Sequence, residues 1–471
     1  MSAKHPFLRG ADRERRKEGV LFVRRPQRRG PATQQFTKCT SSPMQHKTRI
    51  VLFYLFVAAF LIGGTGVLLY SYGWRFSTET KTFQKIGAIY IKTNVRDTAI
   101  TINGKPYKDA AGILQSGTLI SNLLPKTYRV EITKDGYHTY HKTLTVKPSQ
   151  VEELLNVQLI PKQIERTFIA PTKGTRLVDT MQTADKMILQ DTATGIYYLY
   201  DKTNASSTLN LSLAAANAQR GLKIKKVSFV PFKPTQFVIE DASGLKLFDS
   251  EKKTVEVLLK GSLATWNMQD STIVGVELVG TGVRPRTQRA FTLNLIFKSK
   301  ALLGELNAHI ATTTVITALS TTGSGSMAFS DTAYALSLFD PKTKTIRRVS
   351  SNVTSFTFSP DGKKLAFVEA TGEASVLFIE DFNGDIRKKA GEIIAIALPQ
   401  EKPVQTVHWH RDSYHLLIEW TGELAITELD DRKPLNTFLL ISGFTDYRYV
   451  AENDSVYFID NKGINTIRIE H

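Results

Sequence analysis

The longest apolar stretch of the chain is an uncharged run of 25 residues, 50–74. Between residues 50 and 72, 13 of the 23 side chains are Ile, Val, Leu or Phe. At 1.5 Å per residue, a helix of this length crosses a hydrocarbon core of about 30 Å. We therefore predict a transmembrane helix over residues 50–74, with Tyr70, Tyr72 and Trp74 as an aromatic anchor at the interface. The alternatives are a buried core helix and a cleaved signal, but no Ala-x-Ala site follows the run.

Beyond a polar stalk at residues 75–86, the chain shows the two-residue alternation of half-buried β-strands. Asn103-Gly104 supplies the two positive-φ positions of a tight hairpin turn. No segment of helical period interrupts residues 87–161, so we predict a small β-sandwich there. The expected strands lie at residues 88–91, 100–102, 128–132, 143–146 and 154–159.

The order of motifs in this region resembles a PEGA domain, a resemblance that covers about residues 87–160. The motifs are Ile89-Tyr90-Ile91, Ile100-Thr101-Ile102-Asn103-Gly104-Lys105, Leu124-Pro125, Tyr128-Arg129-Val130 and Gly136-Tyr137. Two turns depart from the family pattern, because Val95-Arg96-Asp97-Thr98 replaces the namesake tetrapeptide and Lys126 replaces a glycine. The resemblance implies a non-catalytic, extracytoplasmic β-sandwich of the kind found in surface and envelope proteins.

From residue 162 onward a longer pattern repeats. An aromatic residue ends one strand, four to seven turn residues follow, and an apolar triplet begins the next strand. The landmarks are Met181 (a weaker copy), Phe229, Trp266, Phe358, Trp409 and Tyr449, and a degenerate copy is required near residue 310. The spacing of 37–51 residues is close to that of a four-stranded propeller blade. We therefore predict a β-propeller over residues 162–471.

The landmarks give seven blades, with six as the alternative. Only 22 residues follow Tyr449, too few for a complete blade, so a strand around Thr167-Phe168-Ile169 should complete the last one and close the ring. The clearest motif, Phe358-Ser359-Pro360-Asp361-Gly362-Lys363-Lys364-Leu365-Ala366-Phe367, is similar to the inner hairpin of TolB-like and WD40-like propellers. It supports the fold and carries no chemistry.

Charge gives the predicted helix an orientation. Residues 1–49 hold 13 Lys and Arg against three acidic residues, a net charge of +10. Because positive flanks stay inside, we expect residues 1–49 in the cytoplasm and residues 75–471 outside. Of the total of +17, only about +6 then belongs to the outer part once Arg75 beside the helix is also set aside, which argues against nucleic-acid binding.

The basic tail, residues 1–49, is poor in apolar residues, and we predict that it is disordered and attracted to anionic lipid. It contains the single cysteine, Cys39, so the outer part must fold without disulfides. A large, cysteine-free outer part is more typical of prokaryotes. Met44, directly before the apolar run, is an alternative start to Met1.

One histidine cluster has the spacing of metal ligands. His408 and His410 flank Trp409, and residues two apart on a strand face the same way and can share an ion, with His415 nearby. We favour the alternative, in which they are ordinary blade residues that lead into a turn. His138 and His141 are an odd number apart and should face opposite sides of a strand.

Other motifs are better explained by structure than by chemistry. Asp381-Phe382-Asn383-Gly384-Asp385 has calcium-loop spacing but lacks the later glutamate, so we predict a hairpin turn. Gly323-Ser324-Gly325-Ser326-Met327-Ala328 fails the nucleophile-elbow pattern and is predicted to be a flexible loop. Gly64-Thr65-Gly66 lies in the apolar run, where Ala59 and Gly63 would allow two helices to approach closely.

The sequence thus predicts an all-β protein with one N-terminal transmembrane helix, and it indicates no catalytic, cofactor-binding or metal-binding residues. We expect a non-enzymatic binding or scaffold protein of the prokaryotic cell envelope. Residues 50–74 would contact membrane lipid, and the propeller would bind envelope protein or polysaccharide. The main alternative is an extracytoplasmic hydrolase or lyase that uses the propeller as its platform. A signalling role fits poorly, because the tail holds no domain.

Overall fold

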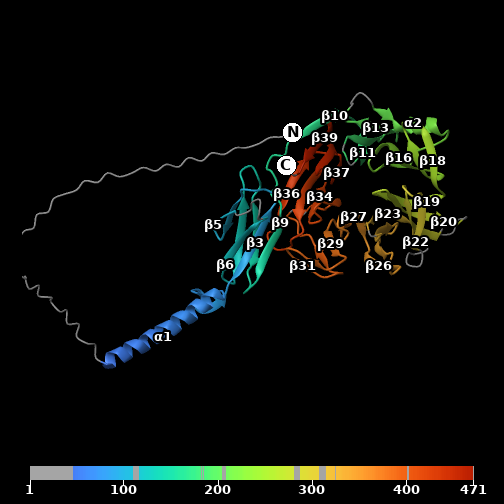
Figure 1. Cartoon of the computed structure of the whole chain (residues 1–471). Helices are drawn as coiled ribbons and strands as arrows, with labels where there is room; N and C mark the ends of the chain where they lie inside the picture. The colour runs from blue at the N-terminus through green and yellow to red at the C-terminus, as the bar shows by residue number, and fades with distance from the viewer. Residues whose placement is uncertain are drawn as a thin grey trace, which may run out of the picture. The chain divides into compact units, whose positions relative to one another are not determined.

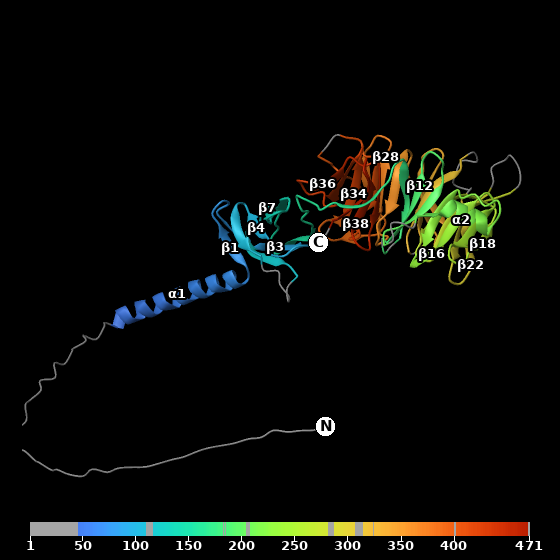
Figure 2. The same ribbon diagram turned by 90° about the horizontal axis from the view of Figure 1, so that it is seen from above.

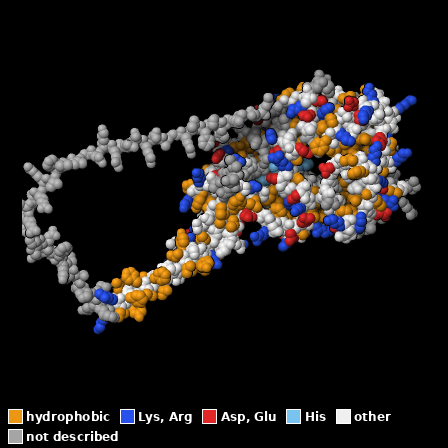
Figure 3. Space-filling model, in the orientation of Figure 1, with side chains coloured by type: hydrophobic (Ala, Val, Ile, Leu, Met, Phe, Trp, Pro, Cys, Tyr) orange, Lys and Arg blue, Asp and Glu red, His pale blue; other side chains and the backbone are white. Residues whose placement is uncertain are grey.

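The computed structural model describes residues 46–109, 116–181, 183, 185–203, 208–280, 287–306, 314–323, 325–399 and 402–469. Helix α1 (His46–Ser71) is long and apolar enough to cross a membrane. Orange apolar side chains cover it in Figure 3. The helix begins before the expected residue 50 and ends before residue 74, because Gly73 adopts φ 82° and Trp74 starts a strand. Most of the tail predicted to be disordered, with Cys39 and Met44, lies outside the described residues.

The expected stalk is a β-hairpin. Strands β1 (Trp74–Ser77) and β2 (Thr82–Lys85) pair antiparallel and form a sheet of their own. Alternating Phe and polar residues in this short segment fit a pleated strand better than an extended linker.

The next region is the predicted sandwich, made of two sheets (Figure 1). One has the order β6-β3-β9 and the other β5-β4-β7-β8. Their strands are β3 (Gly87–Thr93), β4 (Ala99–Ile102), β5 (Lys105–Lys108), β6 (Thr118–Leu123), β7 (Thr127–Thr133), β8 (Tyr140–Thr145) and β9 (Val151–Val157). Alternate residues of these strands, such as Ile89, Val130 and Leu144, form one buried core.

The local turn chemistry of the sandwich was predictable, but two of its strands were not. Asn103 and Gly104 have φ values of 50° and 77°, as a tight hairpin between β4 and β5 requires. Strand β5 has no buried residue, and in β6 the exposed Leu119 between buried Thr118 and Ile120 hides the alternation of burial from the sequence. The parallel pairing of β3 with β9 joins the two ends of the domain.

Within the described residues, seven four-stranded sheets follow, which confirms the seven-blade prediction. Blade 1 is β11 (Thr175–Thr180), β12 (Lys186–Asp191), β13 (Tyr197–Asp201) and β14 (Leu209–Asn210). Blade 2 is β15 (Lys226–Val230), β16 (Lys233–Asp241), β17 (Gly244–Asp249) and β18 (Thr254–Lys260). Blade 3 is β19 (Ser262–Gln269), β20 (Thr272–Val279), β21 (Thr287–Asn294) and β22 (Ser299–Glu305). Blades 4 and 5 are β23 (Ile316–Thr321), β24 (Met327–Asp331), β25 (Leu336–Asp340), β26 (Thr345–Ser350); and β27 (Val353–Phe358), β28 (Lys364–Glu369), β29 (Ala374–Phe378), β32 (Ile393–Ala395).

Blade 6 is β33 (Thr406–Trp409), β34 (His415–Trp420), β35 (Glu423–Glu428) and β36 (Thr437–Ser442). Blade 7 is β10 (Thr167–Pro171), β39 (Gly463–Arg468), β38 (Ser455–Ile459) and β37 (Asp446–Val450), in the order of the sheet. The ring is therefore closed as predicted, by a strand from the start of the propeller paired with the last strand of the chain. Figure 1 shows β10 beside β39.

Two details differ from the sequence prediction, and one hairpin turn confirms it. The degenerate blade begins with β23 at Ile316, and Met327 and Ala328, assigned to a flexible loop, are buried in β24. The predicted turn at Asn383-Gly384 joins β30 (Phe382–Asn383) to β31 (Arg387–Lys388) in an extra hairpin of blade 5. Helix α2 (Leu211–Ala218), capped by the Asn210 side chain, was not predicted and lies beside β18 (Figure 2).

Polar groups join the sandwich to blades 5 and 6. Lys142 of β8 is fully buried, and its Nζ lies 2.6 Å from Glu428 Oε1. The same carboxylate accepts from the Tyr140 hydroxyl at 2.7 Å and from the Asn436 backbone N–H at 2.7 Å. Asp385 accepts from the backbone N–H of Leu155 at 2.6 Å. The sandwich and the propeller are thus in direct contact.

Candidate functional site

The principal cavity of the described residues is the central channel of the propeller. It encloses about 1150 Å³ and is lined by the innermost strand of every blade. Because each blade contributes equivalent residues of its innermost strand, the channel wall combines seven short segments that are far apart in the sequence. Those segments are β11, β15, β19, β23, β27, β33 and β37.

The carboxylates of the channel wall are occupied by contacts between blades. Asp179 on β11 accepts from the Ser228 hydroxyl at 2.6 Å and from the Phe229 backbone N–H at 3.0 Å, both on β15. Asp446 on β37 accepts from the Leu177 backbone N–H on β11 at 2.7 Å. Burial raises the pKa of both carboxyl groups, and these hydrogen bonds oppose that rise.

The remaining blade junctions are bridged in the same way. The bridges are Lys226 Nζ to the Trp266 carbonyl, Asn267 Nδ2 to the Leu319 carbonyl (2.7 Å), the Phe358 N–H to Ser320 Oγ (3.1 Å), Trp409 Nε1 to the Thr357 carbonyl (3.1 Å), and the Thr406 and Tyr447 hydroxyls (3.1 Å apart). Each junction between neighbouring blades therefore has at least one hydrogen bond made by a side chain. The innermost strands are held as a ring, which keeps the channel wall in a fixed geometry.

Basic side chains at the junction of blades 7 and 1 remain exposed to the cavity. Arg448 donates from Nη2 to the Val178 carbonyl at 3.2 Å, and Arg176 donates from Nε to Gln190 Oε1 at 2.7 Å. Each of these hydrogen bonds uses one of the five N–H donors of a guanidinium group. Lys225 on the neighbouring blade is exposed and lines the same cavity. This sector can therefore offer charged donors to a ligand.

His408 also lines the channel, where its ring meets that of Tyr447 edge-on at 5.7 Å between centroids. Burial lowers its pKa to about 4, and the positive charge of Arg448 acts in the same direction. The imidazole is thus neutral at neutral pH. It presents one hydrogen-bond donor and one acceptor without a net charge.

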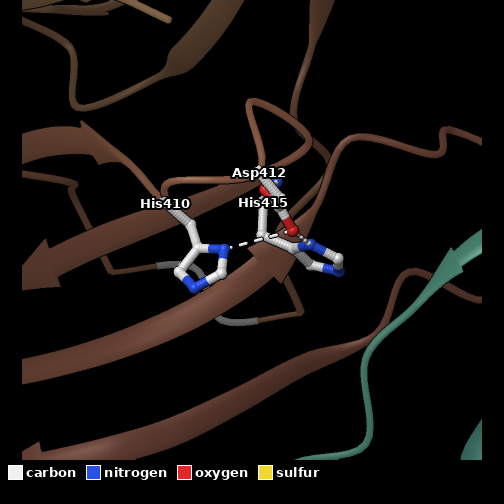
Figure 4. Close-up of side chains that lie close together, drawn as sticks. All are labelled: His410, Asp412 and His415. Atoms are coloured by element: carbon white, nitrogen blue, oxygen red, sulfur yellow. Dashed lines mark hydrogen bonds and ion pairs between the residues drawn. The ribbon is translucent and has the colours of Figure 1, made fainter. Parts of the chain in front are cut away.

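His410 lies elsewhere, in a cluster with Asp412, which is exposed, and His415, which is buried like His410 (Figure 4). Asp412 Oδ2 lies 2.6 Å from His415 Nδ1 and 3.1 Å from His410 Nδ1, while His410 Nε2 lies 2.8 Å from Asp454 Oδ1. Burial opposes protonation of His410, but the nearby carboxylates of Asp412 and Asp454 outweigh burial and raise its pKa to about 9.

The contacts of this cluster are those of an ion-pair network. The raised pKa of His410 favours the imidazolium form, in which both ring nitrogens carry protons that can pair with carboxylates. The distance of 2.6 Å between His415 and Asp412 is that of a direct hydrogen bond. The network joins the turn after β33 to Asp454 of blade 7. His408 and His410 therefore do not share a ligand, because one faces the channel and the other the contact between blades.

The other sequence candidates have structural roles. His138 stacks on Phe438 of blade 6 at 5.1 Å, and the backbone N–H and carbonyl of His141 bond to the side-chain amide of Asn436. Asp381 bonds to Lys389 and the Ala390 N–H within its hairpin. Gly64-Thr65-Gly66 lies in α1, and Ser324 of the rejected nucleophile motif lies outside the described residues.

Sequence reasoning missed the channel residues Asp179, Arg176, Asp446 and Arg448. A signal was present, because the aromatic landmarks mark the ends of innermost strands and the residues just before them line the channel. Asp446 and Arg448 precede Tyr449 in this way. The alternation of acidic and basic residues there did not by itself distinguish residues that line the channel from residues on the outer surface.

Comparison with known proteins gives a domain family and a structural neighbour. No curated protein matches the chain. Among solved structures, the chain is similar to an oligogalacturonate lyase from Vibrio parahaemolyticus, with 13% sequence identity and a TM-score of 0.45, over 65% of this chain and 94% of that one. The model of the PEGA domain family matches residues 86–162, which are the small sandwich and its immediate flanks.

Proposed function

We propose that this protein is a membrane-anchored, extracytoplasmic binding protein of a prokaryotic cell envelope, with its N-terminus in the cytoplasm. The apolar helix α1, the net +10 of residues 1–49 and the PEGA domain support this arrangement. The propeller then forms the head, and its channel receives the ligand.

The observation that carries the proposal is that the acidic side chains of the channel are hydrogen-bonded to neighbouring blades, whereas its basic side chains remain exposed. Asp179 and Asp446 are engaged by neighbouring blades, whereas Arg176, Arg448 and Lys225 remain exposed. Guanidinium groups bind carboxylates through paired hydrogen bonds. The ligand is therefore a polymer or segment that carries carboxylates, either an acidic polysaccharide or an acidic protein segment.

The test is a binding titration with the full-length protein in lipid nanodiscs. The probes are a uronic-acid oligosaccharide, its methyl ester, and a Glu-rich peptide. The acid form of the preferred probe should bind, and neutralising its carboxylates should remove binding. Arg448→Gln should raise Kd about tenfold, because one charge-assisted contact is worth about 1.5 kcal/mol.

Arg348→Gln is the matched control, because Arg348 is exposed on β26, the outermost strand of blade 4. It should leave Kd unchanged. Equal binding of the acid and the ester, or an equal effect of the two arginine variants, would contradict the proposal. The oligosaccharide and peptide arms distinguish the two ligand sources.

A catalytic function is the second candidate, and the observation that favours it is the neutral His408 in the channel beside Arg448. A neutral imidazole next to a carboxylate-binding arginine has the elements of a general base with an electrostatic stabiliser. Incubation with the uronic-acid oligosaccharide tests this directly. Turnover that is lost in His408→Gln would replace the binding proposal with an enzymatic one.

Topology has its own test. Protease added to intact cells should digest the propeller and leave the membrane helix, if the head lies outside. Protection of the propeller in intact cells, with digestion only after lysis, would reverse the proposed orientation.

A further inference from the structure

The hairpin β1–β2 has two chemically different faces. Trp74 is paired with Lys85 and Phe76 with Phe83, so these four side chains share one face of the hairpin. The Phe76 and Phe83 rings meet at 5.3 Å, and they are 53% and 60% exposed. We call Trp74, Phe76, Phe83 and Lys85 the aromatic face.

The opposite face holds the hairpin on the sandwich. Ser77 is buried there, and Arg75 donates to Asn122 Oδ1 at 3.4 Å. At the tip, Lys126 Nζ lies 2.6 Å from Glu79. The Ile86 N–H also donates to the Gly73 carbonyl at 2.9 Å. The aromatic face is therefore directed away from the sandwich by fixed contacts.

An exposed aromatic pair on a two-stranded hairpin is unfavourable in water. Each exposed ring forgoes about 25 cal/mol for every Å² of apolar surface that it fails to bury. The aromatic face would therefore be stabilised by a partner that accepts aromatic rings and a positive charge together.

The chain itself indicates which partner this is. The candidate span ends at Ser71, and only two residues separate it from Trp74, where the hairpin starts. Its 25 residues extend about 37 Å at 1.5 Å each, more than a hydrocarbon core of about 30 Å, so the chain leaves the helix in the headgroup region. Trp, Tyr and Lys are the side chains that favour this region.

We propose that the aromatic face of β1–β2 lies in the headgroup layer of the membrane that α1 crosses, with Lys85 and the turn residue Lys81 toward anionic phosphates. This contact fixes the orientation of the sandwich on the membrane surface, in addition to the tether provided by the helix. It rests on the membrane anchoring proposed above, and on none of the ligand binding.

Neighbouring residues on opposite faces give a sharp test. In a Cys39→Ser background, which leaves no other cysteine in the chain, Phe83→Cys and Gln84→Cys each accept one environment-sensitive fluorophore. The full-length protein is reconstituted into vesicles of phosphatidylcholine and phosphatidylglycerol. A fluorophore at residue 83 should show blue-shifted emission and be quenched by brominated lipid, whereas one at residue 84 should not.

The outcomes separate the two proposals. Water-like emission at both positions, in protein that remains with the vesicles after alkaline extraction, overturns the hairpin contact and leaves the anchor intact. Blue-shifted emission at both positions also overturns it, because one face would no longer be distinguished. Protein that leaves the vesicles overturns the anchoring itself.

A second measurement does not depend on labelling. Trp74 is the one tryptophan outside the propeller, since Trp266, Trp409 and Trp420 are buried in blades 3 and 6. Replacing Phe76 and Phe83 together by Ser should reduce quenching of Trp74 by brominated lipid. Phe297→Ser, at a 79% exposed phenylalanine of blade 3, should not. Equal quenching in both variants would contradict the proposal.

Discussion

At the scale of single residues, two histidines only two positions apart have opposite electrostatic environments. His408 sits in the channel, where burial lowers its pKa to about 4. His410 lies between Asp412 and Asp454, which raise its pKa to about 9. Since the unfolded value is about 6.5, each histidine makes stability depend on pH in a different range.

We predict that folding stability is greatest near pH 6.5 with respect to these two groups. The contribution of His410 is complete below about pH 6.5 and is lost as pH rises through about 9, because only the folded form retains the proton. With a fully buried side chain it amounts to about 3 kcal/mol. His408 acts in the other direction. Because the unfolded state takes up the proton first, His408 lowers the free energy of unfolding as pH falls from about 6.5 to 4.

Urea denaturation of the full-length protein in detergent, followed by tryptophan fluorescence across this pH range, checks the prediction. The difference in the free energy of unfolding between wild type and His410→Gln should change with pH only above pH 6.5. The corresponding difference for His408→Gln should change with pH only below 6.5. Parallel pH profiles for the wild type and both variants would show that neither histidine has a shifted pKa.

At the scale of elements, closure of the ring depends on a glycine. Gly463 begins β39 with φ 147°, and a Cβ there would lie 2.1 Å from the Ala170 carbonyl oxygen of β10. Gly463→Ala should therefore separate the first and last strands of the propeller and cost about 2–4 kcal/mol. The urea midpoint, together with protease cleavage between residues 162 and 172, measures this opening.

Gly261→Ala is the matched control for the closing strand. Gly261 has φ 121°, so a side chain is strained there too, but a Cβ would meet nothing within 4 Å. The control should lose less stability and gain no cleavage near β10. If both variants behave alike, backbone strain rather than collision with β10 explains the loss.

Some elements of the propeller could be predicted from the sequence and others could not. The blades were predictable because the landmark-and-triplet pattern reflects burial on both faces of inner strands, and β10 was predictable by counting residues after Tyr449. Blade 4 gave no landmark, since Ile316–Thr321 contains no aromatic residue. The channel and the His410 network were not predictable, because Asp179 and Phe229 are 50 residues apart, and His410 and Asp454 are 44 apart.

At the scale of the whole molecule, the sandwich and the propeller are joined through a buried lysine. Lys142 Nζ contacts Glu428 and donates to the carbonyls of Arg432 at 2.8 Å and Pro434 at 3.2 Å. Burial raises the pKa of the Glu428 carboxyl, and the Lys142 charge opposes that rise. Neither domain alone satisfies these groups, so they couple the folding of the two domains.

We therefore predict that the sandwich and the propeller unfold in one calorimetric transition, and that Lys142→Ala separates it into two. Removing one partner of a buried ion pair costs about 3–5 kcal/mol, because Glu428 is left as an uncompensated carboxylate. Protonation of that carboxylate relieves the penalty, so the variant should regain stability as pH falls, and adding Glu428→Gln should restore part of it at neutral pH. Lys92→Ala, at an exposed lysine of β3, is the control and should leave a single transition. Two transitions already present in the wild type would mean that the buried pair does not couple the domains.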